Sequence, residues 1–178
     1  SRNQVLSMAI LLLIGGVETT TNLLGTTLIE LNRHRDVFDR VLADHGLIPA
    51  VLEEVLRYNP PVQIIFRHTT VDTEIAGVKI PAGSAIMPIL ASANRDESKF
   101  DNPEVFDIDR KIEVPLMSFG QGPHFCLGNY LSRMEAKSAL EVVFSRFSLI
   151  EPISDDVHWL DSYFARGPHV LPVRYKVR

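Results

Sequence analysis

The chain has 178 residues, 46% of them hydrophobic, with a formal net charge of −4 and a single cysteine. This length and apolar content suit one domain with a substantial core, and the negative charge argues against nucleic acid as the main partner. A lone cysteine cannot form an intramolecular disulfide, and the first residues show no secretory pattern, so we expect a cytoplasmic protein.

A long helix is predicted first, from about Gln4 to Arg33. The segment lacks proline and carries apolar residues through both halves, which predicts a largely buried helix. Its longest apolar run, Ala9 to Val17, is shorter than a bilayer requires, so we expect no membrane span. Two shorter helices are predicted at 36–43 and 49–58, and the second ends at Asn59-Pro60-Pro61 because proline has no amide hydrogen to donate.

The rest of the chain predicts short strands, loops and one more helix. Three β-branched segments, punctuated by glycine, predict a small sheet: residues 64–71, 73–80 and 84–88. Irregular loop and short helices follow to residue 114, and apolar residues at helical spacing predict a helix between Leu127 and Phe147. The last residues, 148–178, favour short strands and turns. The expected fold class is mainly α with small β-sheets.

The cysteine lies just before the last predicted helix, in Phe119-Gly120-Gln121-Gly122-Pro123-His124-Phe125-Cys126-Leu127-Gly128. One thiol cannot build a zinc or iron–sulfur site, but it can be the one thiolate ligand of an iron porphyrin. Free amides at a helix start stabilise a thiolate, and glycines let the backbone approach a flat ligand. An average lone cysteine is an inert buried residue, but the three glycines and the histidine argue against that interpretation here.

The first helix contains the unusual run Gly15-Gly16-Val17-Glu18-Thr19-Thr20. Two glycines in a helix cost roughly 1 kcal/mol each relative to alanine, so a local purpose is expected. Small residues let a bulky group lie against the backbone, and threonine can bond to a carbonyl one turn back. An acid beside a hydroxyl offers a route for protons. On this segment alone, a helix-packing patch is an equally good interpretation.

A Glu54–Arg57 pair is predicted on one face of the helix that ends before the double proline. Residues three positions apart on a helix can form an ion pair that contributes a few tenths of a kcal/mol when it is exposed. Such pairs are common, so the pattern alone is a weak indication of function.

Taken together, these motifs resemble the cytochrome P-450 family of haem-thiolate monooxygenases. Phe119, Gly122, His124, Cys126 and Gly128 match the family's haem-binding loop. The Gly15–Thr20 run is similar to its distal helix, with an acid–alcohol pair after two small residues. The Glu54-x-x-Arg57 pair also falls in the family's order, and the resemblance covers essentially the whole chain.

The resemblance implies a role for each matched residue. Cys126 is the axial ligand of the haem iron, and His124 and Arg67 contact the haem propionates. Glu18 and Thr19 deliver protons. Arg110 closes a structural network with Glu54 and Arg57 that supports the cysteine loop. The residues expected close to the haem ring are Phe119, Gly120, Gly122, Phe125, Gly128, Gly15 and Gly16, and those expected to border the substrate are Val62, Ile64, Ile65, Phe66 and Val170.

The implied activity is insertion of one oxygen atom of O2 into a small apolar organic substrate, with haem b (iron protoporphyrin IX) as cofactor. Electrons would come ultimately from NAD(P)H through a ferredoxin or a similar redox protein. Arg133 and Lys137 are candidate contacts for that partner, although such residues more often simply form a solvated helix face.

The resemblance also implies that residues 1–178 form the C-terminal haem-binding part of a longer domain, because family members carry a large portion before the distal helix. Apolar residues along the first helix would then lack neighbours, which predicts a poorly soluble or weakly stable chain. Two alternatives remain: a truncated, non-catalytic haem-binding fragment, and a haem-thiolate enzyme driven by peroxide. The Glu18–Thr19 pair disfavours the second alternative.

Overall fold

A computed structural model describes all residues of the chain, 1–178. The helices are α1 (Arg2–Arg33), α2 (Arg35–Ala43), α3 (Ile48–Tyr58), α4 (Leu90–Ala93) and α5 (Asn129–Arg146). The strands are β1 (Arg67–His68), β2 (Thr73–Ile75), β3 (Val78–Ile80), β4 (Ala85–Ile86), β5 (Phe147–Pro152) and β6 (Val173–Val177). The predicted class, mainly α with small sheets, is confirmed.

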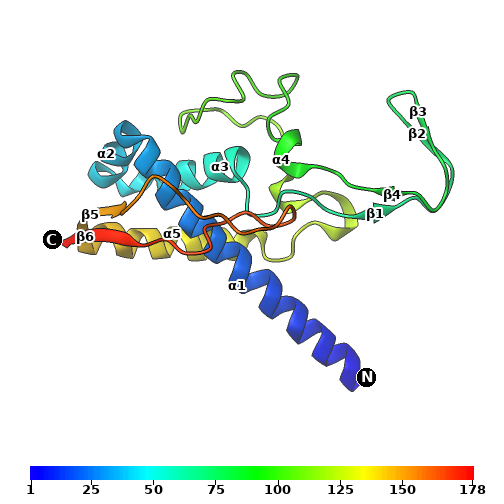
Figure 1. Ribbon diagram of the computed structural model, residues 1–178, viewed down its shortest axis with the longest axis horizontal. Coiled ribbons are helices and arrows are strands. Elements are labelled where there is room, and N and C mark those ends of the chain that lie inside the picture. Colours follow the sequence, from blue (N-terminus) through cyan, green and yellow to red (C-terminus); the bar gives the residue numbers. More distant parts are fainter.

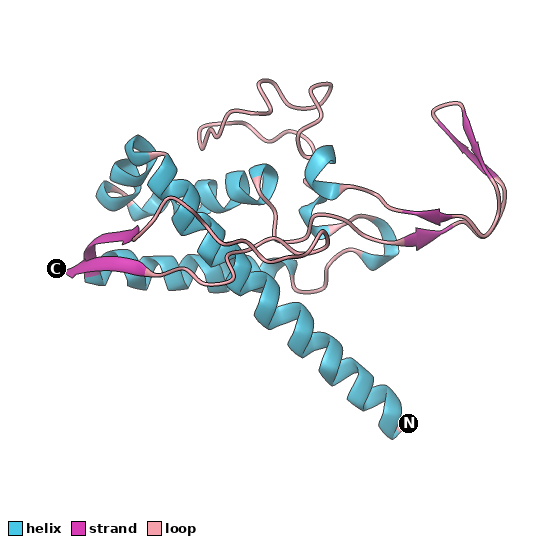
Figure 2. Cartoon of the chain, viewed as in Figure 1, coloured by secondary structure: helices cyan, strands magenta, loops and turns pink.

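The core lies where the C-terminal half of α1 meets α2, α3 and α5. Its central aromatic side chains, Phe38 and Phe144, are fully buried and their ring centroids lie 5.7 Å apart. Strand β5 pairs with β6 antiparallel beside these helices, and Ile150 joins the core. Figure 2 shows most of the helices on the left, α1 extending to the lower right, and the β2–β3 hairpin projecting at the upper right.

The ends of α3 follow from its sequence. Pro49 lies in the first turn, where a missing amide hydrogen costs nothing, and Pro60 follows the C-terminal residue Asn59. The apolar face of α3 is buried and includes Val51, Leu52 and Val55. Helix α3 therefore crosses the core between α1 and α5, and its C-terminal end reaches the loops on the other side.

The predicted small sheet is corrected to two separate antiparallel ladders. Strand β1 pairs with β4, whereas β2 pairs with β3 through a hairpin. Pro81 follows β3 and has no amide hydrogen, and Gly83 adopts a φ of 78°. These two residues turn the chain between β3 and β4, so the strands cannot join one continuous sheet.

The prediction of a largely buried first helix is wrong for its N-terminal half. Every residue from Ser1 to Glu18 is exposed, and full burial begins at Thr20. Figure 1 shows this half, in blue, projecting away from the other helices. No part of the chain covers its apolar side chains.

Helix α1 is also long and apolar enough to cross a membrane, with a mean hydropathy of 1.4 over an entirely unburied window of 18 residues. The expectation of no span rested on the shorter run Ala9–Val17, which underestimates the helix. The core helix of a soluble protein meets the same criteria of length and hydropathy, so these two properties do not assign a membrane span.

The exposed half of α1 predicts self-association of the isolated chain. Leu6 and Leu13 lie seven residues apart on one helix face and are 50% and 66% exposed. Changing both to Gln should weaken association about tenfold or more for each leucine, given about 1.5–3 kcal/mol for burying such a side chain. Sedimentation velocity measures the effect, with Glu113→Gln, an exposed change elsewhere, as control. Equal association of both variants would contradict it.

Candidate functional site

The cysteine loop is held in place by backbone hydrogen bonds on both sides of Cys126. The Cys126 amide donates to the Phe119 carbonyl at 3.0 Å, which closes the loop. The side-chain amide of Asn129 donates to the Cys126 carbonyl at 2.9 Å. The thiol itself is free and half-buried. The loop thus presents one sulfur from a fixed backbone.

The glycines of this loop are required by its backbone. Gly120 and Gly122 have φ values of 69° and 80°, the left-handed region that side chains disfavour. A Cβ added to either would meet no atom within 4 Å, so open space lies beside them. Cys126 precedes the first residue of α5 by three positions, with the turn Leu127-Gly128 between them, so the prediction that it lies at the helix start is corrected by one turn.

The Gly15-Gly16 pair also faces open space. A Cβ at either position would meet nothing within 4 Å, so these glycines are not a packing patch within this chain. The Thr19 hydroxyl donates to the Gly15 carbonyl at 2.6 Å, the predicted bond one turn back. Glu18 is exposed and Thr19 half-buried.

A buried acid–guanidinium network lies at the C-terminal half of α3. Arg57 donates to both oxygens of Glu54, Nε to Oε2 and Nη2 to Oε1, each at 2.8 Å. Both side chains are at most 1% exposed. Arg110 Nε lies 3.5 Å from Glu54 Oε1, and the Asp107 amide donates to the same oxygen at 2.8 Å. The structure therefore brings together the three residues predicted for this network.

The two arginines also bind the irregular segment before the cysteine loop. Arg57 donates to the carbonyls of Pro103 at 2.8 Å and Val105 at 3.0 Å, and Arg110 donates to that of Val105 at 3.0 Å. A segment with no regular structure is thereby ordered by two charged donors, Arg57 from α3 and Arg110 from the segment itself.

Sequence reasoning missed the residues that connect this network to the cysteine loop. Asn94, fully buried, accepts a hydrogen bond from the Met117 amide at 2.7 Å and donates to Ser118 Oγ at 2.8 Å. Ser118 donates in turn to the Leu56 carbonyl at 2.5 Å. Nothing in the sequence distinguishes Ser118 from a surface serine.

Arg133, considered above as a partner contact, instead supports the loop from α5. Its guanidinium donates to both carboxylate oxygens of Glu53, at 2.5 and 3.0 Å, and lies 4.3 Å from the Phe119 ring centroid. Lys137 is exposed and pairs with Glu141 at 3.5 Å. Arg133 is therefore engaged within the fold, and Lys137 remains on the solvated face.

The other predicted contacts lie on the loop side of the molecule. Arg67 and His124 are exposed, and the Arg67 side chain donates only to the Phe66 carbonyl, so neither side chain has a carboxylate partner within the chain. Phe125 is 42% exposed. Gly128 approaches the sulfur, with a 3.9 Å gap between its ideal Cβ position and Cys126 Sγ.

The predicted substrate-pocket residues are not all alike. Ile64 is buried, Val62 and Ile65 are half-buried, and Val170 is exposed. Val62 forms a bridge with Ala165, so the segment around Ala165 lies beside it, and Val170 lies five residues further along the chain.

The side chains of this chain do not form a metal-binding cluster by themselves. No group of three or more His, Cys, Asp or Glu side chains is placed to bind an ion. A metal bound at Cys126 therefore needs most of its ligands from another molecule, as a porphyrin supplies through its four nitrogens.

Comparison with known proteins identifies relatives of one kind. The family model "Cytochrome P450" matches residues 1–168. "Cytochrome P450 109" from Bacillus spizizenii is 43% identical over 98% of this chain, and "Steroid C26-monooxygenase" from Mycolicibacterium smegmatis is 40% identical over 97%. In both cases the chain spans 43% of the relative's length.

Solved structures agree with these relatives. Cytochrome P450 CYP109Q5 from Chondromyces apiculatus superposes with a TM-score of 0.96 and 48% identity, covering 100% of this chain and 46% of that one. CYP109E1 from Bacillus megaterium, in complex with corticosterone, gives a TM-score of 0.92 and 40% identity, covering 98% of this chain and 47% of that one.

The buried network predicts a large effect on stability. Glu54→Gln leaves the guanidinium groups of Arg57 and Arg110 buried without their carboxylate, which should cost about 3–5 kcal/mol of unfolding free energy. Glu151→Gln, in the exposed pair with Arg174, is the matched control and should cost less than about 1 kcal/mol. Urea unfolding measures both. Similar losses in the two variants would contradict the structural role of the network.

Proposed function

Because the chain belongs to the cytochrome P450 family, we propose that it is the haem-binding, C-terminal part of a monooxygenase. Relatives bear the names of a steroid C26-monooxygenase, a cyclomarin C epoxidase and an erythromycin C-12 hydroxylase. The chain spans less than half of their length, so in this proposal residues 1–178 pack against a preceding portion of the same domain.

The observation that carries the proposal is the fixed, partly exposed sulfur of Cys126. A loop with two left-handed glycines and backbone bonds on both sides of the cysteine presents the thiol with no partner from the chain. An inert cysteine needs none of this loop geometry. A thiolate that is the single protein ligand on one side of a porphyrin requires it, because its position fixes the ring.

The remaining residues fit a haem on chemical grounds. Cys126 would bind the iron. Arg67 and His124, exposed hydrogen-bond donors without carboxylate partners, would bind the propionates. Two phenylalanines would make apolar contact with the ring, Phe119 and Phe125. The glycines would leave room for the ring beside the backbone: Gly120, Gly122, Gly128, Gly15 and Gly16. When bound, the haem supplies the activation of O2 that no side chain can provide.

The role proposed for Glu18 and Thr19 is to hold and move a proton. Thr19 donates its hydroxyl hydrogen to the Gly15 carbonyl, which leaves the Oγ1 lone pairs free to accept another hydrogen bond. Glu18 precedes Thr19 in the chain, and its exposed carboxylate can exchange protons with water. Together they form a short route from solvent to the open space over Gly15 and Gly16.

The finer parts of the proposal rest on the relatives and on the exposed apolar surface. A relative is solved with corticosterone and with testosterone, which supports a small apolar substrate bordered by Val62, Ile64, Ile65 and Val170. Further partners are O2 and a ferredoxin or similar protein that relays electrons from NAD(P)H. The exposed half of α1 would pack against the preceding portion rather than cross a membrane, in a cytoplasmic enzyme.

One alternative has a specific observation in its favour. The uncovered half of α1 also fits a truncated, non-catalytic fragment that binds haem weakly. A peroxide-driven enzyme is less well supported, because it would not need the Glu18–Thr19 pair. A test of function therefore requires a completed fold, which joining this chain to the preceding half of the Chondromyces relative would supply.

Haem ligation by Cys126 predicts the spectrum of this fusion. The reduced protein with carbon monoxide should show the red-shifted band of a thiolate-bound haem, and Cys126→Ala should abolish it because alanine offers no ligand. Ser148→Ala, an exposed change in β5, should leave the band unchanged. A Cys126→Ala protein that keeps the band would disprove the assignment.

Proton delivery predicts a coupling defect. In the fusion supplied with a redox partner and an apolar substrate, Thr19→Ala should lower the product formed per O2 consumed by about tenfold or more, because general acid–base groups contribute at least this much. Thr21→Ala is a matched control, since Thr21 makes the same bond one turn back, to Val17 at 2.8 Å. If both variants couple like the parent, Thr19 does not deliver protons.

A further inference from the structure

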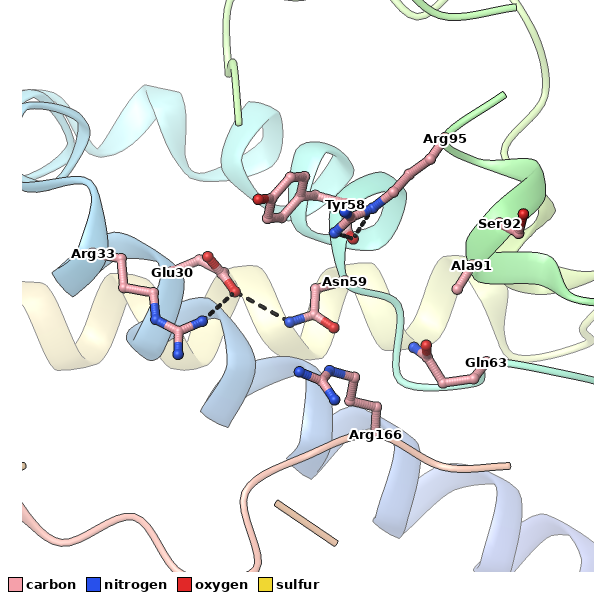
Figure 3. Close-up of a pocket in the computed structure, with 9 residues that line it drawn as sticks. All are labelled: Glu30, Arg33, Tyr58, Asn59, Gln63, Ala91, Ser92, Arg95 and Arg166. Carbon is pink, nitrogen blue, oxygen red and sulfur yellow. Dashed lines mark hydrogen bonds and ion pairs between the residues drawn. The ribbon is translucent and has the colours of Figure 1, made fainter. Parts of the chain in front are cut away.

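A polar cavity of about 400 Å³ lies away from the cysteine, between α1, the end of α3, α4 and the C-terminal segment. Figure 3 shows the side chains that line it. Three arginines (Arg33, Arg95 and Arg166) face a single acid, Glu30. The residues that line the cavity therefore carry a net positive charge, and apart from Tyr58 and Ala91 the remaining lining residues are polar.

The single acid is already satisfied by the protein. Glu30 is 1% exposed. Its Oε1 accepts hydrogen bonds from the Asn59 amide at 3.1 Å and from Arg33 Nη1 at 3.3 Å. Both donors act on Oε1, so the Glu30 carboxylate pairs directly with Arg33 and forms no hydrogen bond or ion pair with the other two arginines, Arg95 and Arg166.

Of those two arginines, Arg95 is engaged and Arg166 is not. Arg95 pairs with Glu104 at 2.5 Å and donates to the Tyr58 carbonyl at 2.6 and 3.0 Å. Arg166 lies with its guanidinium carbon 4.0 Å from the Trp159 ring centroid, and its side chain has no hydrogen bond or ion pair within the chain. Stacking fixes the plane of the guanidinium and leaves its five donors unused.

The electrostatics of the cavity agree with an anion site. Burial lowers the pKa of Arg166 most, the charges of Arg33 and Arg95 lower it further, and the Glu30 carboxylate partly opposes them. Positive charge is therefore crowded around a partly buried guanidinium, which an anion would relieve. Figure 3 shows Arg166 reaching from the C-terminal segment toward Asn59, with Gln63 and Arg33 on the same cavity.

We propose that this cavity binds a small phosphate-bearing anion, held by Arg166 with support from Arg33 and Gln63. A planar guanidinium forms two parallel hydrogen bonds to a phosphate, and Arg166 is the one arginine of the cavity without an acidic partner, because Arg33 pairs with Glu30 and Arg95 with Glu104. The site is separate from the one proposed for haem. Glu30 follows Glu18 by twelve residues on α1, which is about 18 Å at the helical rise.

The binding test uses inorganic phosphate as the probe, with calorimetry and thermal unfolding. Phosphate should bind and raise the melting temperature, and Arg166→Gln should weaken its binding by about tenfold or more, since a charge-assisted hydrogen bond is lost. Arg146→Gln, at the exposed end of α5, is the matched control and should bind like the parent. Succinate, a dicarboxylate of similar charge, tests the preference for phosphate, and sodium chloride at equal ionic strength tests for simple screening.

The outcomes separate the possible occupants. A shift that chloride reproduces, or equal phosphate affinity in Arg166→Gln and the parent, would overturn the proposal. So would tighter binding of succinate than of phosphate. Phosphate binding to the 178-residue chain but not to the fusion would assign the cavity to an acidic side chain of the preceding portion, and would also overturn it. The carbon monoxide spectrum of the fusion is independent of all these outcomes.

Discussion

The bond between Glu54 and Arg57 is the interaction on which the candidate site depends. Two opposite charges without access to water are stable only when their geometry and their additional hydrogen bonds offset the cost of desolvation. Here the pair is bidentate, Arg110 and the Asp107 amide approach the same carboxylate, and Arg57 binds three carbonyls of other segments. The hydrogen bonds of the network thus offset the cost of burying the charges. They also hold in place a chain segment that has no regular structure.

That order reaches the sulfur through short polar links. Arg57 donates to the Asn94 carbonyl at 3.2 Å, and the Asn94 side chain binds Met117 and Ser118 at the base of the cysteine loop. On the opposite side, Arg133 stacks on Phe119 while it pairs with Glu53 of α3. The loop is therefore held from two directions by residues attached to the same helix, which explains how a glycine-rich segment can present Cys126 in one position.

The sequence predicted the elements better than their surroundings. The spacing of apolar residues and the prolines around α3 gave its ends to within a residue, because these signals are local. The Gly120–Cys126 motif predicted the loop because its chemistry is concentrated in a few adjacent positions. Burial of α1 was misjudged because it depends on neighbours from elsewhere, and the roles of Asn94 and Ser118 depend on a contact across 24 residues that no local pattern encodes.

The last turns of α3 connect the two halves of the proposed catalytic geometry. From this one helix end, the Leu56 carbonyl binds Ser118 beneath the cysteine loop, and Asn59 binds Glu30 on α1. Helix α1 is continuous from Glu30 back to Thr19, so a fixed Glu30 also limits where Thr19 can lie. The Cys126 thiol and the Thr19 hydroxyl come from distant parts of the sequence, yet the segments that carry them are both hydrogen-bonded to the same buried turn at the end of α3.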